Sequence, residues 1–252
     1  MKFFRYLYNI LLNLGFNPIK IYSYRYIFRF LRQRKLFIKL GGGRVKFYPI
    51  LDNYTDSAGE TKSYYFHQDL LIANYIYKNK PKRHIDVGSR IDGFVAHVAS
   101  YRTIDVMDIR PLNLNYYDNI KFVQADLMDD NFNLFEICDS LSCLHALEHF
   151  GLGRYNDPID PLGHLKGFNN LTKMLKPSGI LYISFPIGSP EVYFNAHRVF
   201  APKDILKWIE NKFNLERFDY INDQGDLIRN SSIDKVGPLS FGCGIYTLIK
   251  VS

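Results

Sequence analysis

Three aspartates follow one another in the order typical of a nucleoside-binding site. Asp86 lies inside a short apolar run, Asp108 ends the next run and Asp126 follows a third, with Gly88 just after the first. An acid at the end of a second strand accepts ribose hydroxyls, and an acid after a third reaches an adenine amino group. Each acid alone is better explained by bonds to nearby backbone N–H groups. As an ordered set they predict a ligand site.

The segment 83–93 predicts how the chain would hold such a ligand. It has the pattern of a buried strand, a tight turn at Gly88 and the start of a helix after Gly93. Backbone N–H groups at that turn and at the helix N-terminus face the ligand. Asp86 would orient the turn or the charged end of the ligand. Arg90 has two alternatives: it pairs with a ligand carboxylate or it fills the pocket.

A cluster of titratable residues after the fourth apolar run predicts acid–base chemistry. His145, Glu148 and His149 lie within five positions. If the substrate loses a hydroxyl proton, His145 or His149 is the candidate base, oriented by Glu148. The alternative is that Glu148 and His149 cap the following turn. The spacing H-x-x-E-H also occurs in zinc enzymes, but the segment 150–153 would end a helix too early to bring both histidines onto a metal, so we expect no metal.

Polar side chains in the later loops are the candidates for substrate binding. A phosphate or carboxylate suits the pair His197 and Arg198, whose alternative role is to anchor the loop. The full set expected to bind substrate is Tyr155, Asn195, His197, Arg198 and, from an earlier helix, His67. Asp69 of the same helix is expected to reach the same cleft.

Strand-like and helix-like segments alternate from residue 83 onwards. This alternation predicts a doubly wound α/β fold, in which ligands bind at the carboxyl edge of the sheet. The expected strands are 85–87, 103–107, 121–124, 137–143, 180–185, 217–221 and 245–251, and the expected helices are 63–78, 94–101, 161–175 and 202–213.

The order of these motifs resembles that of class I S-adenosylmethionine-dependent methyltransferases. The resemblance covers residues 60–252: the glycine turn, the acids of strands two and three, the histidine segment 144–149, and the helix–turn–strand segment 174–184. It implies a mostly parallel, seven-stranded Rossmann-like sheet closed by an antiparallel hairpin, with S-adenosylmethionine as cofactor. One departure is that Arg90 and Asp92 stand where those enzymes usually have glycines.

Four strings also resemble an uncharacterised bacterial and nematode family, domain of unknown function 268. They are residues 65–70, 84–94, 142–155 and 194–200. The resemblance implies a methyltransferase-like fold and points to glycan-related pathways without supplying a reaction.

The N-terminal segment differs in composition from the rest of the chain. Residues 1–51 hold eleven Lys and Arg and no Asp or Glu. The net charge of +7 of the whole chain therefore comes from this segment. We predict a basic, amphipathic helical appendage over residues 1–43 and the α/β domain over 44–252. Residues 1–40 suit the surface of an anionic membrane; the alternative is a helical cap with a solvated basic face. No membrane span, signal peptide or nucleic-acid motif is expected, and three scattered cysteines suit a reducing compartment.

The sequence therefore predicts a cytoplasmic S-adenosylmethionine-dependent methyltransferase, with its appendage at the inner face of the membrane. The expected acceptor is polar, a sugar of cell-surface glycan biosynthesis or another small molecule. One alternative is a non-catalytic module of the same fold that binds a nucleotide or glycan at a membrane-bound assembly. Another is a different transferase or a hydrolase that uses the histidines.

Overall fold

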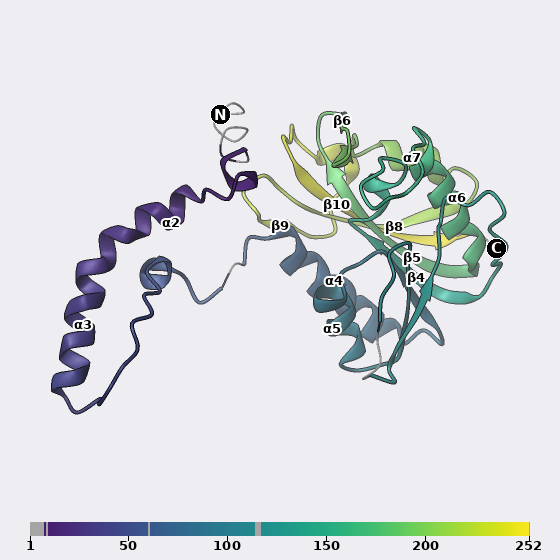
Figure 1. The fold of residues 1–252 in the computed structure, drawn as a ribbon. Helices are drawn as coiled ribbons and strands as arrows, with labels where there is room; N and C mark the ends of the chain where they lie inside the picture. Colours follow the sequence, from purple (N-terminus) through teal and green to yellow (C-terminus); the bar gives the residue numbers. More distant parts are fainter. Residues whose placement is uncertain (1–7, 9, 60, 114–116, 252) are drawn as a thin grey trace. The chain divides into compact units, whose positions relative to one another are not determined.

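The structure is a computed structural model that describes residues 8, 10–59, 61–113 and 117–251. The chain forms two compact units, Met1–Glu60 and Thr61–Ser252. The second unit holds the sheet and every predicted site residue (Figure 1).

The second unit is built on one eight-stranded sheet with the order β3-β2-β1-β4-β5-β10-β8-β9. The first five strands in that order are parallel, and β10, β8 and β9 are added antiparallel. The strands are β1 (His84–Val87), β2 (Ile104–Asp108), β3 (Ile120–Gln124), β4 (Cys138–Leu144), β5 (Leu175–Ile187), β8 (Phe213–Ile221), β9 (Leu227–Ile228) and β10 (Gly242–Lys250).

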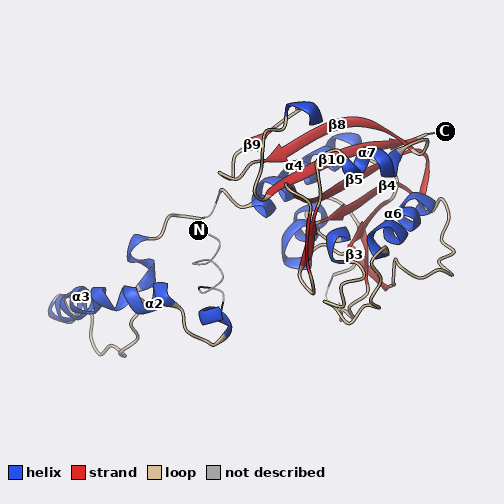
Figure 2. Cartoon of the chain, turned by 90° about the horizontal axis from the view of Figure 1, so that it is seen from above, coloured by secondary structure: helices blue, strands red, loops and turns tan. Residues whose placement is uncertain are grey.

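Helices cover both faces of this sheet (Figure 2). α4 (Tyr64–Asn79) and α5 (Ala96–Ala99) pack on one face, and α6 (Gly163–Met174) and α7 (Asp204–Ile209) on the other. Each layer has its own apolar core, so β1 is buried on both faces and all four of its residues are inaccessible. Burial on both faces removes the alternation of exposed and buried residues that a half-exposed strand shows. In β1 and β4 the buried positions include the polar residues His84, Asp86, Ser140 and Ser142, which bond one another.

The predicted doubly wound α/β fold is confirmed, with the parallel strands at the predicted places. The sheet has eight strands where seven were expected, because the two-residue β9 extends its edge. Several elements differ in length. The helix expected over 202–213 ends at Ile209, and the one expected over 94–101 is α-helical only over Ala96–Ala99. β5 begins at Leu175 and β8 at Phe213, five and four residues before their predicted starts.

Short elements complete the loops at the carboxyl edge. A five-residue π-helical segment, Ile91–Val95, precedes α5. A 3-10 turn, Leu147–His149, follows β4, and a small antiparallel hairpin joins β6 (Glu191–Tyr193) to β7 (His197–Val199). The single turn at 147–149 agrees with the expectation that no long helix carries the two histidines.

The first unit contains α2 (Pro18–Ser23) and α3 (Ile27–Lys39), linked by the 3-10 turn Tyr24–Tyr26. Asn17 caps α2 by accepting the backbone N–H of Lys20 at 3.2 Å, as the Asn-Pro pair predicts. At the start of the predicted helical appendage, residues 1–7 and 9 lie outside the described residues, and residues 8 and 10–13 are helical.

The segment 44–59 packs on α3. The rings of Phe30 and Phe47 meet edge to face at 5.4 Å, and the Arg34 side chain donates to the Val45 carbonyl at 3.3 Å. The strand-like run 45–51 is not a strand in the structure, because no described strand lies beside it to complete its hydrogen bonds. The domain boundary at 43/44 stays a prediction. Within the described residues, no helix has the length and apolar character needed to cross a bilayer.

Candidate active site

The turn after β1 forms the floor of the candidate site. Gly88 has φ +78°, a conformation that L side chains rarely adopt, and donates its N–H to the Met107 carbonyl at 2.9 Å. A Cβ added to Gly88 would lie 2.7 Å from the Cβ of Ala146. Glycine is therefore required here both by backbone conformation and by the approach of the loop after β4.

The side chain of Asp86 in β1 holds this turn in place through hydrogen bonds. Its carboxylate accepts the N–H of Ser89 at 3.1 Å, the hydroxyl of Ser89 at 2.8 Å and the hydroxyl of Ser142 at 2.5 Å. His84 contacts Ser142 in turn, at 3.1 Å. Burial raises the pKa of Asp86 to about 7 and lowers that of His84 to about 3. These bonds hold the turn, which is one of the two roles predicted for Asp86.

The second half of the turn carries an exposed ion pair and a buried acid. Arg90 bonds Asp92 through two nitrogens, at 2.7 and 3.0 Å, with both side chains mostly exposed. Gly93 lies beside Asp69 of α4, whose Oδ2 would be 3.2 Å from a Cβ at that position. Asp69 is 7% exposed, and burial raises its pKa although Gln68 donates to it at 3.0 Å.

Asp108 lies at the end of β2, as predicted, but Arg110 already bonds it. The backbone N–H and Nε of Arg110 donate to Oδ1 at 2.8 and 2.9 Å, and Nη2 donates to Oδ2 at 2.5 Å. A carboxylate offers about four acceptor positions, so about one is left for a ligand. The expected acceptance of both ribose hydroxyls by Asp108 alone would require Arg110 to move.

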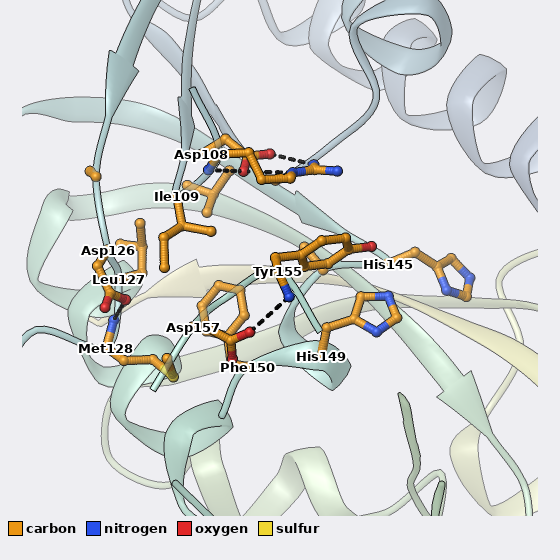
Figure 3. Close-up of a pocket in the computed structure, with 15 residues that line it drawn as sticks. Asp108, Ile109, Asp126, Leu127, Met128, His145, His149, Phe150, Tyr155 and Asp157 are labelled. Atoms are coloured by element: carbon orange, nitrogen blue, oxygen red, sulfur yellow. Dashed lines mark hydrogen bonds and ion pairs between the residues drawn. The ribbon is translucent and has the colours of Figure 1, made fainter. Parts of the chain in front are cut away.

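Asp126 contributes to a small cavity of about 50 Å³ next to Asp108. Its Oδ1 accepts the N–H of Met128 at 2.8 Å. Figure 3 shows Asp126, Leu127 and Met128 on one side of this cavity and His145 and His149 on the other, with the Tyr155 ring between them. The structure thus brings the β2 and β3 acids and the histidine loop to one place.

A larger cavity of about 590 Å³ adjoins the small one. Its size is within the roughly 300–1,000 Å³ usual for small-molecule sites. The two cavities share Gly88, Arg110, His145, His149 and Tyr155. The larger one is also bordered by Tyr64, Tyr65, Gln68, Asp69, Arg90, Gly93, Glu148, Arg154, His197 and Phe241, among others.

His145 is held through both ring nitrogens. Nδ1 lies 2.8 Å from Glu148 Oε1, and Nε2 lies 3.2 Å from the Sγ of Cys243 on β10. Burial alone would lower the pKa of His145 by disfavouring the charged ring. The interactions with Cys243 and Glu148 have the larger effect and raise this pKa well above its ordinary value. Both nitrogens are used within the protein, and a charged ring carries no lone pair. His145 is therefore arranged to position Glu148.

His149 has the geometry of a base. Its Nδ1 lies 2.6 Å from the Ala196 carbonyl, which can only accept, and 3.3 Å from Nη1 of Arg154, which can only donate. The much shorter contact places the proton on Nδ1 and leaves a lone pair on Nε2. Nε2 lies 3.7 Å from Glu148 Oε1, beyond hydrogen-bond distance. Burial lowers the His149 pKa, which keeps the ring neutral near pH 7.

Three predicted substrate residues are not brought to either cavity. Arg198 is buried, and its guanidinium donates to four backbone carbonyls, those of Glu148, Phe150, Asp160 and Pro161. Asn195 has φ +61° between β6 and β7, and His67 contacts Phe66. The other two, Tyr155 and His197, border the larger cavity. Arg198 thus anchors the loop, the alternative role given to it above.

Three residues of the site were not among those predicted to act there. Arg110, Arg154 and Cys243 border a cavity or bond a residue that does. A signal was present for one of them, since Arg110 follows Asp108 by two positions. The pairing of Cys243 with His145 had none, since it depends on β10 lying beside β5.

Searches of protein families and solved structures gave matches. Residues 99–227, just over half of the chain, match the model of the family described as "Caenorhabditis protein of unknown function, DUF268". No curated protein matches the chain.

Solved methyltransferases have a similar fold at low sequence identity. The N-methyltransferase NodS from Bradyrhizobium japonicum is 12% identical, with a TM-score of 0.51 over 75% of this chain and 89% of that one. A putative sarcosine dimethylglycine methyltransferase from Galdieria sulphuraria is 13% identical, with 0.52 over 73% and 86%. The [4+2]-cyclase SpnF is 12% identical, with 0.53 over 77% and 86%. The chain belongs to the DUF268 family and has the fold of class I S-adenosylmethionine-dependent methyltransferases.

Proposed function

We propose that the protein is an S-adenosylmethionine-dependent methyltransferase that acts on a polar acceptor. The observation that carries the proposal is the pair of adjoining cavities, which joins the Gly88 turn, Asp108, Asp126 and a neutral histidine base at the carboxyl edge of the parallel strands. Ligands of doubly wound folds bind at this edge. NodS, of similar fold, was crystallised with S-adenosyl-L-homocysteine.

The residues present fit this cofactor. S-adenosylmethionine carries an ammonium and a sulfonium, and Asp69 is a buried carboxylate that borders the larger cavity and accepts from the amide of Gln68. Oε2 of Glu148, at the same cavity, is buried and has no partner within the described part of the chain. A buried acid bonded by a neutral group, and a buried carboxylate oxygen without a donor, favour a cationic ligand. When bound, the cofactor would supply an activated methyl group.

Each part of the cofactor has candidate residues. Asp69 would accept a hydrogen bond from the ammonium of the cofactor. Arg90 would release Asp92 and pair with the carboxylate of the cofactor in its place. The remaining acceptor position of Asp108 would take one ribose hydroxyl. Asp126 would lie at the adenine edge, where the small cavity of about 50 Å³ must widen to admit the ring.

His149 would remove the proton of the acceptor. Its Nε2 lone pair borders both cavities, and the Ala196 carbonyl holds the opposite nitrogen in the protonated form. Glu148, oriented by His145, would stabilise the imidazolium that forms, since its Oε1 lies 3.7 Å from Nε2. Most of the remaining catalysis is positioning of the acceptor for in-line attack.

Calorimetric titration of the full chain with S-adenosylhomocysteine tests the cofactor assignment. We expect binding that weakens about tenfold or more with Asp126→Ala and with Asp69→Asn, because each loses a bond to a polar or charged group. Asp130→Ala is the matched control, since that acid is exposed and pairs with Lys166. Absence of binding, or equal loss in the control, would reject the assignment.

We propose a sugar as the acceptor. The larger cavity is bordered by five Tyr and Phe rings, Tyr64, Tyr65, Phe94, Tyr155 and Phe241, among acids and the amide of Gln68. Aromatic faces pack on the C–H faces of sugars while polar groups bond the hydroxyls, and the same features would suit another small polar molecule. Transfer of a radiolabelled methyl group to a panel of sugars and sugar nucleotides distinguishes these: labelling confined to non-sugar acceptors would reject the sugar.

We also propose that the first unit binds anionic membrane surfaces. α3 carries Arg29, Arg32 and Lys35 without any acid, beside the exposed apolar side chains Phe28, Leu36 and Phe37. Such a helix lies at the bilayer interface. The full chain should co-sediment with vesicles containing phosphatidylglycerol, and less with pure phosphatidylcholine. Arg25→Gln/Arg29→Gln/Arg32→Gln should reduce sedimentation, and equal partitioning would exclude this role.

The second candidate function is a non-catalytic module of the same fold. It is favoured by the bidentate Arg110–Asp108 pair, which occupies the acid that would hold the ribose. The fold itself does not decide, since a [4+2]-cyclase also has it. The titration above discriminates: no binding of S-adenosylhomocysteine by the native chain, with binding restored in Arg110→Ala, supports this alternative.

A further inference from the structure

Two arginines contact one tyrosine ring at the wall shared by the two cavities. The guanidinium carbon of Arg110 lies 4.5 Å from the centre of the Tyr155 ring, and that of Arg154 lies 5.3 Å from it. All three residues border the larger cavity. Two cations on one ring concentrate positive charge, and the aromatic face partly offsets their repulsion.

The loop that carries Arg154 and Tyr155 is held in place. Buried Asp157 accepts the N–H of Tyr155 at 3.1 Å and the N–H of Gly151 at 2.8 Å. The Tyr155 ring meets His149 edge to face at 5.7 Å, and Arg154 donates to the Ala196 carbonyl at 3.0 Å, which also fixes His149. The cluster is therefore fixed relative to the candidate base.

The cationic side chains around the larger cavity are paired with acids except at Arg154. Arg90 pairs with Asp92, Arg110 with Asp108 and His145 with Glu148. The Arg154 guanidinium donates to the Ala196 carbonyl and lies 3.3 Å from His149 Nδ1, and within the described residues it makes no ion pair. Asp157, close to it in sequence, is used by backbone N–H groups.

We propose that the Arg110–Tyr155–Arg154 cluster binds an anionic group, phosphate or carboxylate, on the acceptor. The anionic group would accept two parallel hydrogen bonds from the guanidinium of Arg154. Arg110 would add a second positive charge beside it. The neutral part of the acceptor would then lie beside His149. This inference rests on the proposed function in that the bound molecule is taken to be the methyl acceptor. Binding of an anion at this site can be tested without any turnover.

The test titrates the full chain calorimetrically with glucose, glucose 6-phosphate and glucuronate, with and without S-adenosylhomocysteine. We expect a charged sugar to bind and glucose to give no heat at the same concentrations. The stronger of the two charged sugars identifies the anion as phosphate or carboxylate. Arg154→Gln should weaken that binding about tenfold or more, because a charge-assisted pair is lost.

Matched variants exclude non-specific attraction to a basic protein. Arg32→Gln removes an exposed charge of the first unit and Arg229→Gln one of the second, and both should change binding by less than about threefold. Tyr155→Phe should retain binding because the ring remains, whereas Tyr155→Leu should lose it.

Two results would overturn the anion site: equal binding of glucose and the charged sugars, or an Arg154→Gln variant that binds them as well as the native chain does. Weakening as large in Arg32→Gln as in Arg154→Gln would also overturn it. Binding of S-adenosylhomocysteine is scored separately. Its absence would reject the proposed function while the anion site is still judged by Arg154→Gln.

Discussion

Burial disfavours the charged form of Asp86, so the free energy of unfolding of the protein depends on pH. Its pKa is raised by burial from 3.8 to about 7. Between these values the folded chain holds a proton that the unfolded chain releases. The contribution of Asp86 to stability is therefore full below about pH 4 and is lost as the pH rises through 7.

Asp86→Asn should accordingly cost more stability in acid than in base. At pH 5 the variant should lose about 1–2 kcal/mol from weaker bonds to the serines. At pH 8 the loss should shrink, because the native chain then carries a buried charge. Urea unfolding at both pH values measures this, with Asp118→Asn on an exposed loop as control. A loss that grows with pH would contradict the raised pKa.

The two histidines after β4 should titrate in opposite directions. Burial lowers the pKa of His149, whereas Cys243 and Glu148 raise that of His145 against the effect of burial. At pH 6.5 we expect a neutral His149 with its proton on Nδ1 and a charged His145. Long-range proton–nitrogen NMR of the rings reports both states, with His145→Gln and His149→Gln for assignment.

Cys243→Ala provides the matched test of that pair. The variant removes one of the groups that raise the His145 pKa, so the titration of His145 should move toward lower pH while that of His149 changes little. Cys243→Ser, which keeps an acceptor beside Nε2, should move it less. A His145 that is neutral at pH 7 in the native chain would return it to the list of candidate bases.

Residue types and order were enough to place the acids but not to predict their partners. Asp86, Asp108 and Asp126 lie at the edge where strand order puts them. The bond from Arg110 to Asp108 depends on a side-chain rotamer, which a sequence pattern does not determine. Arg198 illustrates the reverse case: its spacing suggests a ligand, but the β6–β7 hairpin turns the guanidinium onto carbonyls.

Among the elements of the site, the turn after β1 depends most strongly on one residue. Gly88→Ala should destabilise the fold by about 1–3 kcal/mol, because alanine is strained at φ +78° and its Cβ meets Ala146 at 2.7 Å. Gly237→Ala is the control, since nothing lies within 4 Å of a Cβ there. Urea unfolding and S-adenosylhomocysteine titration of both variants check the prediction, which fails if the two behave alike.

Strands that are buried on both faces were predictable, and elements that depend on a partner were not. β1 and β4 are buried because helices cover both sides of the sheet, and the polar side chains within them bond each other. The run 45–51 has no neighbouring strand, so it stays irregular. α7 stops at Ile209 because the chain must turn to enter β8 at Phe213, a requirement that helical periodicity does not show.

At the scale of the whole molecule, the charge asymmetry of the sequence follows the two compact units. Residues 1–51, which have no acid, lie within the first unit, and every residue of the candidate site lies in the second. The composition predicts this asymmetry of charge. The boundary at 43/44 stays a prediction, because the segment 44–59 contacts α3 through Phe47 and the Val45 carbonyl.

Fragments that begin at residue 44 and at residue 61 separate the predicted boundary from the observed compact units. Phe47 packs on Phe30, and the Tyr54 hydroxyl bonds Gln33 at 2.5 Å, so removal of residues 1–43 exposes both rings without giving them a new partner. We expect both fragments to bind S-adenosylhomocysteine within about twofold of the full chain and to unfold at the same urea concentration. If the fragment from 44 is clearly more stable than that from 61, the segment 44–60 belongs to the α/β domain, as composition predicts.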